Sequence, residues 1–122
     1  MTFQGFNAIR GNGAEAFQCA ACGEFIAHSA GLILLNGKMR HVFVNPAGLK
    51  CDFQTFDNCP GAIALGEATE EYTWFPGYAW TAAFCASCLL HLGWLYKGVS
   101  CNGRPPAFWG ILVERVITSQ EG

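Results

Sequence analysis

Four cysteines of this chain stand in two matched pairs, Cys19-Ala20-Ala21-Cys22 and Cys85-Ala86-Ser87-Cys88. Two residues between thiols allow one tight turn to present both sulfurs to a single ion. Two such turns make a closed tetrahedral site of four thiolates, with Zn–S bonds of about 2.3 Å. Because four thiolates leave no open position, we expect one structural zinc ion per chain, which joins the start of the domain to its later half. The alternatives are four ordinary buried cysteines or a redox pair.

The other cysteines show no ligand spacing. Cys51, Cys59 and Cys101 are therefore expected to be small buried hydrophobic residues. His91 lies close to the second cysteine pair, where we expect it to pack or to form a hydrogen bond rather than to bind the metal. Seven cysteines are an odd number, which fits a reducing compartment better than a disulfide framework.

The stretch from Tyr72 to Tyr96 reads YTWFPGYAWTAAFCASCLLHLGWLY and contains no Asp, Glu, Lys or Arg. Such a stretch is a membrane span, a hydrophobic core segment or an aromatic pocket. The turn signal Pro76-Gly77, the later Gly93 and the metal-competent side chains argue against a span. The tryptophans are also spread along the stretch instead of gathering at two interfaces.

Three tryptophans of this stretch have a placement that favours a pocket. Trp74 and Trp80 flank the turn FPGYA, which would face both indoles onto one space, and Trp94 follows a second turn after the cysteines. A tryptophan buries about 150–250 Å² and carries one N–H that requires a partner. We therefore expect these three to form a rigid cage that is open to solvent, and Trp109, in the apolar AFWGILV, to belong to the core.

Length and composition indicate one compact domain. The chain has 122 residues, of which 52% are hydrophobic and 13% charged, so it buries a core without help from disulfides. The net charge is −2 and the basic residues are scattered, which argues against nucleic-acid binding. Because the N-terminus shows no signal peptide, we expect a cytoplasmic protein without a membrane segment.

The pattern of apolar residues and turns predicts a mainly antiparallel β domain with no linker. Asn36-Gly37 is a strong hairpin turn, and further turns are expected at 45–48 and 58–61. One short helix is expected at 24–30. The expected strands cover residues 32–35, 40–44, 49–56, 62–65, 70–75, 79–85, 91–96 and 107–117.

Six motifs follow one another along the chain in the order FQCAACG, NPAG, TWFPGYAW, CASC, HLGW and FWGIL. In this order they resemble the CULT domain, the ligand-binding domain of cereblon, and most closely its stand-alone single-domain bacterial members. The resemblance covers about Phe17 to Val116, and TWFPGYAW followed by Cys-x-x-Cys and HLGW is highly specific. It divides the chain into an N-terminal extension (1–16), a CULT-like ligand-binding domain (17–118) and a C-terminal tail (119–122).

The resemblance implies a β-tent, in which two antiparallel sheets meet at an angle and are pinned by a zinc ion on four cysteines. Members of this family are not enzymes; they bind uridine and cyclic imides, such as the glutarimide of thalidomide, in a cage of three tryptophans. Carried over to this chain, the cage is Trp74, Trp80 and Trp94, with Tyr96 as its floor or rim. The backbone of Tyr72-Thr73-Trp74 would bond the imide N–H and carbonyl, and Asn45 and Pro46 would border the entrance.

This chain departs from the family pattern at several positions. Tyr72 and Thr73 replace a histidine and a serine, which preserves backbone contacts but removes any histidine side-chain contact. Cys51 stands where other members carry a larger ring, which leaves the outer rim more open. The protease-like and helical regions that tie cereblon to a ubiquitin ligase are also missing, so that role does not transfer.

Several ligands and one enzyme remain as alternatives. A pyrimidine nucleoside and a peptide whose terminal Asn or Gln has cyclised to an imide both fit such a cage, with micromolar affinity expected. A quaternary ammonium ion fits by cation–π attraction, assisted by Glu70 and Glu71.

The enzyme alternative is a methionine-R-sulfoxide reductase, which shares the tent-like fold and the four-cysteine zinc site. Cys101-Asn102 is similar to its nucleophile followed by asparagine. A nucleophilic cysteine needs a lowered pKa, and only Arg104 is a close basic neighbour. Trp94 stands where the reductase has a second histidine, which weakens this alternative.

Overall fold

The structure, a computed structural model, describes residues 15–100 and 104–120. In these residues the regular secondary structure consists of β-strands and two short 3-10 helices, η1 (Ser29–Gly31) and η2 (Val113–Arg115). The strands are β1 (Glu15–Cys19), β2 (Phe25–His28), β3 (Arg40–Val44), β4 (Lys50–Phe56), β5 (Ala62–Ala64), β6 (Tyr78–Cys85), β7 (His91–Gly98), β8 (Ala107–Leu112) and β9 (Val116–Gln120).

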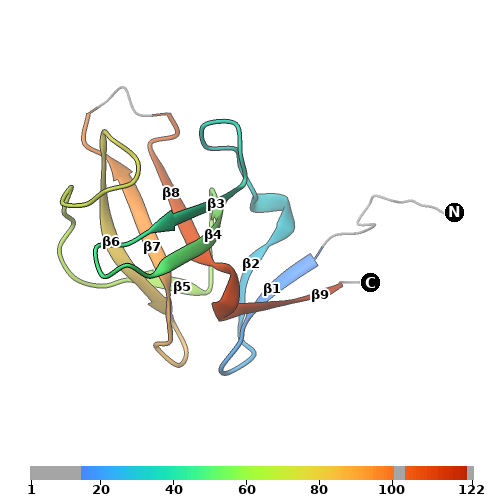
Figure 1. Cartoon of the computed structure of the whole chain (residues 1–122). Coiled ribbons are helices and arrows are strands. Elements are labelled where there is room, and N and C mark those ends of the chain that lie inside the picture. The colour runs from blue at the N-terminus through green and yellow to red at the C-terminus, as the bar shows by residue number, and fades with distance from the viewer. Residues whose placement is uncertain (1–14, 101–103, 121–122) are drawn as a thin grey trace, which may run out of the picture.

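The strands form two antiparallel sheets, as expected. The smaller sheet has the order β2-β1-β9, and the larger has the order β3-β4-β8-β7-β6-β5. Figure 1 shows the smaller sheet on the right and the larger sheet on the left. The strands reach two residues beyond each boundary of the CULT-like domain expected at 17–118, and that division stays a prediction.

The passage from one sheet to the other takes place at η2. The single strand expected at 107–117 is wrong, because the chain leaves β8 at Leu112 and pairs with β1 only from Val116 onward. Tertiary contacts hold this break in place. The backbone C=O of Arg115 accepts a hydrogen bond from Ala20 N–H (2.9 Å), and its guanidinium donates to the C=O of His91 (2.8 Å).

The helix expected at 24–30 is also wrong. Residues Phe25–His28 form β2, which pairs with β1 and buries Ile26 and Ala27, and only η1 follows it. Burial of this pair against the other sheet prevails over local helix propensity, which is a weak preference. Neither β1 nor β9 was among the expected strands, because each is short and mixes polar with apolar residues.

Two other expected strands are replaced by turns. Segment 32–35 has only isolated bridges, from Leu32 to Phe56 and from Leu35 to Lys38. Asn36 and Gly37 do form a tight two-residue turn, with φ of 52° and 82°, but a single bridge closes it. Segment 70–75 is not a strand, because the turn around Pro76-Gly77 begins early.

The core consists of two apolar clusters. One packs Phe17, Ile26, Phe56 and Leu92 beside the cysteine pairs. The other is aromatic and lies within the larger sheet, with Phe53, Phe75, Tyr96 and Phe108 at its centre. Across the described ranges, no helix has the length and apolar character needed to cross a membrane.

Candidate functional site: a four-cysteine cluster beside an aromatic cavity

The two cysteine pairs come together in space. Cys19 ends β1 and Cys85 ends β6, so each pair lies in the turn that follows a strand. The sulfurs of Cys19, Cys22, Cys85 and Cys88 all lie within 4.8 Å of one another, close enough to hold one metal ion. Because β1 belongs to the smaller sheet and β6 to the larger, such an ion would connect the two sheets. In Figure 1 the β1–β2 and β6–β7 turns both point to the lower edge of the view.

The two turns have the same backbone geometry. The N–H of Gly23 donates to the C=O of Cys19, and the N–H of Leu89 donates to the C=O of Cys85, both at 2.8 Å. Gly23 and Leu89 each adopt positive φ, 82° and 66° respectively. This conformation is ordinary for glycine and strained for leucine.

Two thiols of the cluster have pKa values shifted in opposite directions. Burial raises the pKa of Cys19, but N–H groups of Cys22 and Ala21 that point at its sulfur lower the value to about 7. The N–H of Leu90 lowers the pKa of Cys88, whereas burial and the neighbouring sulfurs raise it, with a net value of about 12. A bound divalent cation would lower the pKa of such a thiol, because metal ligation favours the thiolate form.

An aromatic cavity of about 340 Å³ opens on the larger sheet. All the ligand-binding residues expected from the sequence, except Thr73, contribute to its wall, and His91 joins them. The lining residues are Asn45, Pro46, Tyr72, Trp74, Trp80, His91, Trp94 and Tyr96.

Strands β6 and β7 supply one wall of the cavity. Trp80 on β6 stands directly opposite Tyr96 on β7, and Trp94 is two residues before Tyr96, so all three side chains share one face. The indole N–H of Trp80 donates to the backbone C=O of Glu71 at 2.8 Å, which ties β6 to the loop before it.

Trp74 forms the opposing wall and comes from a loop. Its ring meets Trp94 edge to face, with centroids 5.3 Å apart and planes at 86°. Its ring also stacks nearly parallel on Phe43 of β3 (5.2 Å, 12°) and on Phe53 of β4 (5.6 Å, 15°). The two phenylalanines were not among the expected site residues; their positions on the inward faces of β3 and β4 are the signal that marks them.

His91 lines the cavity because of a β-bulge. Regular alternation would place Leu92, not His91, on the face of Trp94 and Tyr96. The register shifts between Ala83 and Phe84, so Leu92 is the extra residue and is buried in the core instead. The His91 ring then meets Trp94 edge to face at 5.7 Å, and its Nε2–H donates to the C=O of Gly93 at 2.9 Å. His91 thus packs and forms a hydrogen bond, as expected.

The loop that carries Tyr72 and Trp74, both of which line the cavity, has its own backbone hydrogen bonds. Tyr72 has φ of 61° and an exposed side chain, while the N–H of Thr73 is used by the C=O of Glu70 (3.1 Å). The hydroxyl of Thr73 bonds the backbone of Phe75, so this residue shapes the loop rather than the cavity. Within residues 15–100 and 104–120, the N–H groups of Tyr72 and Trp74 have no hydrogen-bond partner.

The rim at Asn45 and Pro46 is held by a side-chain turn. Asn45 Oδ1 accepts the N–H groups of Ala47 (3.0 Å) and Leu49 (2.9 Å), which rigidifies the loop between β3 and β4. This turn presents Pro46 at the cavity mouth.

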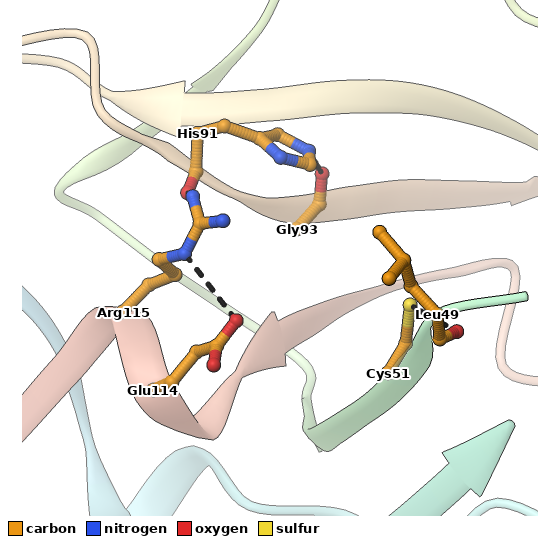
Figure 2. Close-up of polar contacts among 6 residues, drawn as sticks. All are labelled: Leu49, Cys51, His91, Gly93, Glu114 and Arg115. Carbon is orange, nitrogen blue, oxygen red and sulfur yellow. Dashed lines mark hydrogen bonds and ion pairs between the residues drawn. The ribbon is translucent and has the colours of Figure 1, made fainter. Parts of the chain in front are cut away.

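Arg115 links the cysteine cluster to the cavity wall. Its guanidinium donates to the His91 carbonyl, and its Nε lies 3.7 Å from the Glu114 carboxylate, as Figure 2 shows.

The same figure shows the Cys51 thiol beside Leu49, whose C=O lies 3.8 Å from the sulfur. Burial and the charge of Glu114 raise the pKa of Cys51. Cys51 and Cys59 are both buried, as expected, and Cys101 lies outside the described residues.

Two glycines allow β7 and β8 to pack at the back of the cavity. A Cβ on Gly93 would lie 1.9 Å from the carbonyl oxygen of Gly110. A Cβ on Gly110 would lie 2.9 Å from the ring of Phe53. The absence of both side chains therefore decides how closely Phe53 approaches Trp94, at 5.8 Å between centroids.

Comparison with known proteins gives one family match and several relatives. Residues 15–107 match the Yippee-Mis18 family, described as "Yippee zinc-binding/DNA-binding /Mis18, centromere assembly". Cereblon of Danio rerio is 38% identical over 84 residues, which are 66% of this chain and 20% of that protein. Cereblon of Drosophila erecta is 33% identical over 98 residues, 78% of this chain and 17% of that protein. Cereblon of Xenopus tropicalis is 36% identical over 84 residues, which are 66% of this chain and 19% of that protein.

The match thus spans about a fifth of the length of these relatives. Two antiparallel sheets, a four-cysteine cluster and a family match over residues 15–107 agree with one another. The chain belongs to the Yippee-Mis18 family, and within it is a cereblon-like CULT domain.

Proposed function

We propose that this domain is a non-enzymatic binding module that holds flat, neutral cyclic imides between Trp74, Trp80 and Trp94. One observation carries the proposal: three indoles and the Tyr96 ring surround a cavity of about 340 Å³, and none of the described residues that line it has a carboxylate, ammonium or guanidinium group. The imidazole of His91, which also lines the cavity, is kept neutral, since burial lowers its pKa. An apolar cavity with a few polar groups is a typical small-molecule site.

The cavity matches a ring with two apolar faces and one polar edge. Indole faces favour contact with flat or aliphatic rings. Tyr72 and Trp74 both line this cavity, and their backbone N–H groups, which bond no other described residue, are candidate donors to the carbonyl oxygens of an imide. The imide N–H in turn requires an acceptor, for which the backbone C=O groups of residues 72–74 are the nearest candidates by analogy with the CULT family.

Larger ligands would keep the imide inside and place the rest of the molecule over the rim. The Tyr72 side chain is 67% exposed and Pro46 is exposed, so the mouth is accessible to solvent. The proposal therefore includes glutarimides of the thalidomide type, uridine, and peptides that end in a cyclised Asn or Gln.

We also propose that the four-cysteine cluster holds one structural zinc ion. The Sγ atoms of Cys19 and Cys88 are 3.6 Å apart, and those of Cys22 and Cys85 are 3.7 Å apart. A tetrahedron with Zn–S bonds of about 2.3 Å has edges of about 3.8 Å, so this donor set fits zinc. The metal would hold the two sheets together and fix the β6–β7 turn from which the cavity wall starts.

The competing functions have weaker support. Neither Glu70 nor Glu71 is among the described residues that line the cavity, which weakens the case for a quaternary ammonium ion held with the help of their carboxylates. The net charge of −2 disfavours the DNA binding that the family description mentions. The reductase alternative depends on Cys101, which lies outside the described residues; the thiols of Cys51 and Cys59 have pKa values raised by burial, which disfavours a nucleophilic role for these two. The six described cysteines are free, which supports a reducing location such as the cytoplasm.

Titration of the zinc-loaded protein with glutarimide, followed by tryptophan fluorescence, tests the proposal. We expect a saturable change with a Kd in the micromolar range, which corresponds to roughly −8 kcal/mol. Trp80→Phe should weaken binding by tenfold or more, whereas Trp109→Phe, outside the cavity, serves as the matched control and should not. N-methylglutarimide, which lacks the imide N–H, should bind much more weakly. A flat response at millimolar glutarimide would contradict the proposal.

A further inference from the structure

His41 is a buried imidazole directly behind the cavity wall. It lies on β3 with 6% of its surface exposed. Among the described residues, Thr55 is the one other polar residue that is buried. Its Nε2 lies 3.1 Å from the backbone C=O of Lys38. A carbonyl oxygen only accepts hydrogen bonds, so Nε2 carries the proton and Nδ1 is bare in the neutral ring.

His41 and Trp74 are connected through one layer of aromatic rings. His41 stands opposite Phe53 in the β3–β4 register, and the two rings are stacked, with centroids 5.5 Å apart and planes at 20°. The ring of Trp74 completes this layer, because it stacks on the rings of Phe53 and Phe43. Phe75, next to Trp74 in sequence, meets the edge of the His41 ring at 5.4 Å. A displacement of His41 therefore moves the groups that fix the orientation of Trp74.

Among the residues that the structure describes, no negatively charged side chain contacts the His41 ring. Each element packed on it contributes a phenyl ring: Phe43 from β3, Phe53 from β4 and Phe75 from the loop. The charged group that acts on it is the Lys38 ammonium, which repels a second positive charge.

Other ionisable groups near this layer stay neutral or lie elsewhere. Arg40 and Asp52 project from the opposite face of the β3–β4 pair, where they bind each other at 2.7 Å. Cys51 and Tyr96 belong to the same apolar cluster, and burial raises the pKa of both, so both are neutral near pH 7.

We infer that His41 is a positioning residue for the cavity: the neutral imidazole keeps Phe53 and Trp74 in place, and protonation of the ring loosens this wall and weakens ligand binding. The binding part of this inference rests on the proposed function. Protonation would create an Nδ1–H among phenyl rings, where it has no acceptor. Stacking on Phe53 gives some cation–π attraction, but it does not satisfy that edge N–H. In agreement, burial and Lys38 lower the pKa of His41 despite its bond to the Lys38 carbonyl.

The first measurement needs no ligand. Heteronuclear NMR of the zinc-loaded protein between about pH 7.5 and pH 5 follows the rings of His41, Phe53 and Trp74. We expect the Trp74 indole and Phe53 resonances to shift with the same midpoint as His41, and these shifts to be missing in His41→Phe. Trp74 and Phe53 resonances that stay constant while His41 titrates would overturn the inference.

The second measurement is the glutarimide Kd over the same pH range. By linkage, the Kd should rise as pH falls, by roughly tenfold for each unit by which ligand binding lowers the His41 pKa. His41→Phe should bind at neutral pH and show a flat profile. His28→Asn, on β2 of the smaller sheet, is the matched control and should keep the wild-type slope.

The third histidine separates this explanation from a direct one, because His91 lines the cavity. His91→Phe should change affinity but retain the pH dependence. A slope that persists in His41→Phe and disappears in His91→Phe would overturn the inference. Absence of glutarimide binding at about pH 7.5 would count against the proposed function alone, since the NMR titration tests His41 without ligand.

Discussion

Trp94 and Gly110 stand directly opposite each other on β7 and β8. Because Gly110 has no side chain, the Phe53 ring fits over this position and reaches Trp94 edge to face. The same ring stacks on Trp74, so one missing side chain helps to set the distance between two walls of the cavity. The aromatic cavity therefore depends on a backbone position that no ligand would touch.

Gly110→Ala is expected to disturb the cavity more than the core. The added Cβ would lie 2.9 Å from the Phe53 ring, which is fully buried, so this ring must shift to make room for it. Overpacking of this kind costs about 1–3 kcal/mol, and we expect glutarimide affinity to fall several-fold as Phe53 shifts toward Trp74 and Trp94. Calorimetric titration and thermal unfolding measure the two effects.

Gly31→Ala is the matched control for this substitution. Its Cβ would approach a side-chain oxygen of the exposed Asp57 at 3.1 Å, and Gly31 does not line the cavity. Affinity should be unchanged. Equal losses of affinity in the two variants would show that Gly110 has no particular role at the cavity.

Loss of one cysteine ligand should destabilise the whole domain. In Cys85→Ser the cluster loses a thiolate from the end of β6, and with it the connection between the two sheets. Structural zinc contributes folding free energy directly, so we expect a loss of several kcal/mol or no folding. Chelation of wild-type protein should lower the melting temperature in the same way.

Cys59→Ala controls for the loss of a buried sulfur. Cys59 packs in the same apolar cluster as Cys19 and Cys85 but is not part of the metal-binding group. We expect a modest destabilisation and an intact response to chelator. A Cys85→Ser variant that melts at the wild-type temperature would remove zinc from the explanation of stability.

The cavity and the cysteine cluster were predictable because local sequence marks them. Each Cys-x-x-Cys pair occupies a single turn, and Trp74, Trp80, Trp94 and Tyr96 fall on neighbouring turns and strands. His91 was missed as a lining residue because a β-bulge at Leu92 reverses the alternation on which strand assignments depend.

The elements that the sequence did not predict depend on contacts between distant residues. The break between β8 and β9 is held by two hydrogen bonds of Arg115, which accepts one from Ala20 and donates one to His91, 95 and 24 positions earlier in the chain. Likewise, β2 forms because Ile26 and Ala27 are buried against the opposite sheet. Neither contact leaves a periodic pattern in the sequence.

A reciprocal pair of substitutions tests the two cysteine turns. Leu89 has φ of 66° and is 56% exposed, so its side chain contributes little burial to offset the strain. The left-handed conformation costs roughly 1–2 kcal/mol for a residue with a Cβ. We expect Leu89→Gly to lie within about 1 kcal/mol of wild type, since relief of strain offsets the greater entropy of glycine.

Gly23→Leu introduces the same strain at the equivalent position of the first turn. A Cβ at Gly23 meets no atom within 4 Å, so strain rather than a clash determines the result. We expect a loss of about 1–2 kcal/mol by chemical denaturation of the zinc-loaded protein. If Leu89→Gly were strongly destabilising while Gly23→Leu were neutral, the shared backbone geometry would not explain the two turns.

The stability of the domain should fall in mild acid, and part of that fall should come from His41. Burial lowers the pKa of His41 below its value of about 6.5 in an unfolded chain. Above that value both states hold a neutral ring, so the stability does not depend on its titration. As pH falls through about 6.5 the unfolded state takes up the proton first, and the free energy of unfolding declines until the lower folded-state pKa is reached. The decline is at most about 1.4 kcal/mol for each unit of pKa lowering.

Urea unfolding of wild type and His41→Phe at several pH values measures the difference in their free energies of unfolding. The acid sensitivity of the cysteine cluster cancels in this difference, because both proteins share it. We expect the stability advantage of the wild type over His41→Phe to shrink as pH falls below about 6.5; a constant difference would show that His41 is not protonated on unfolding.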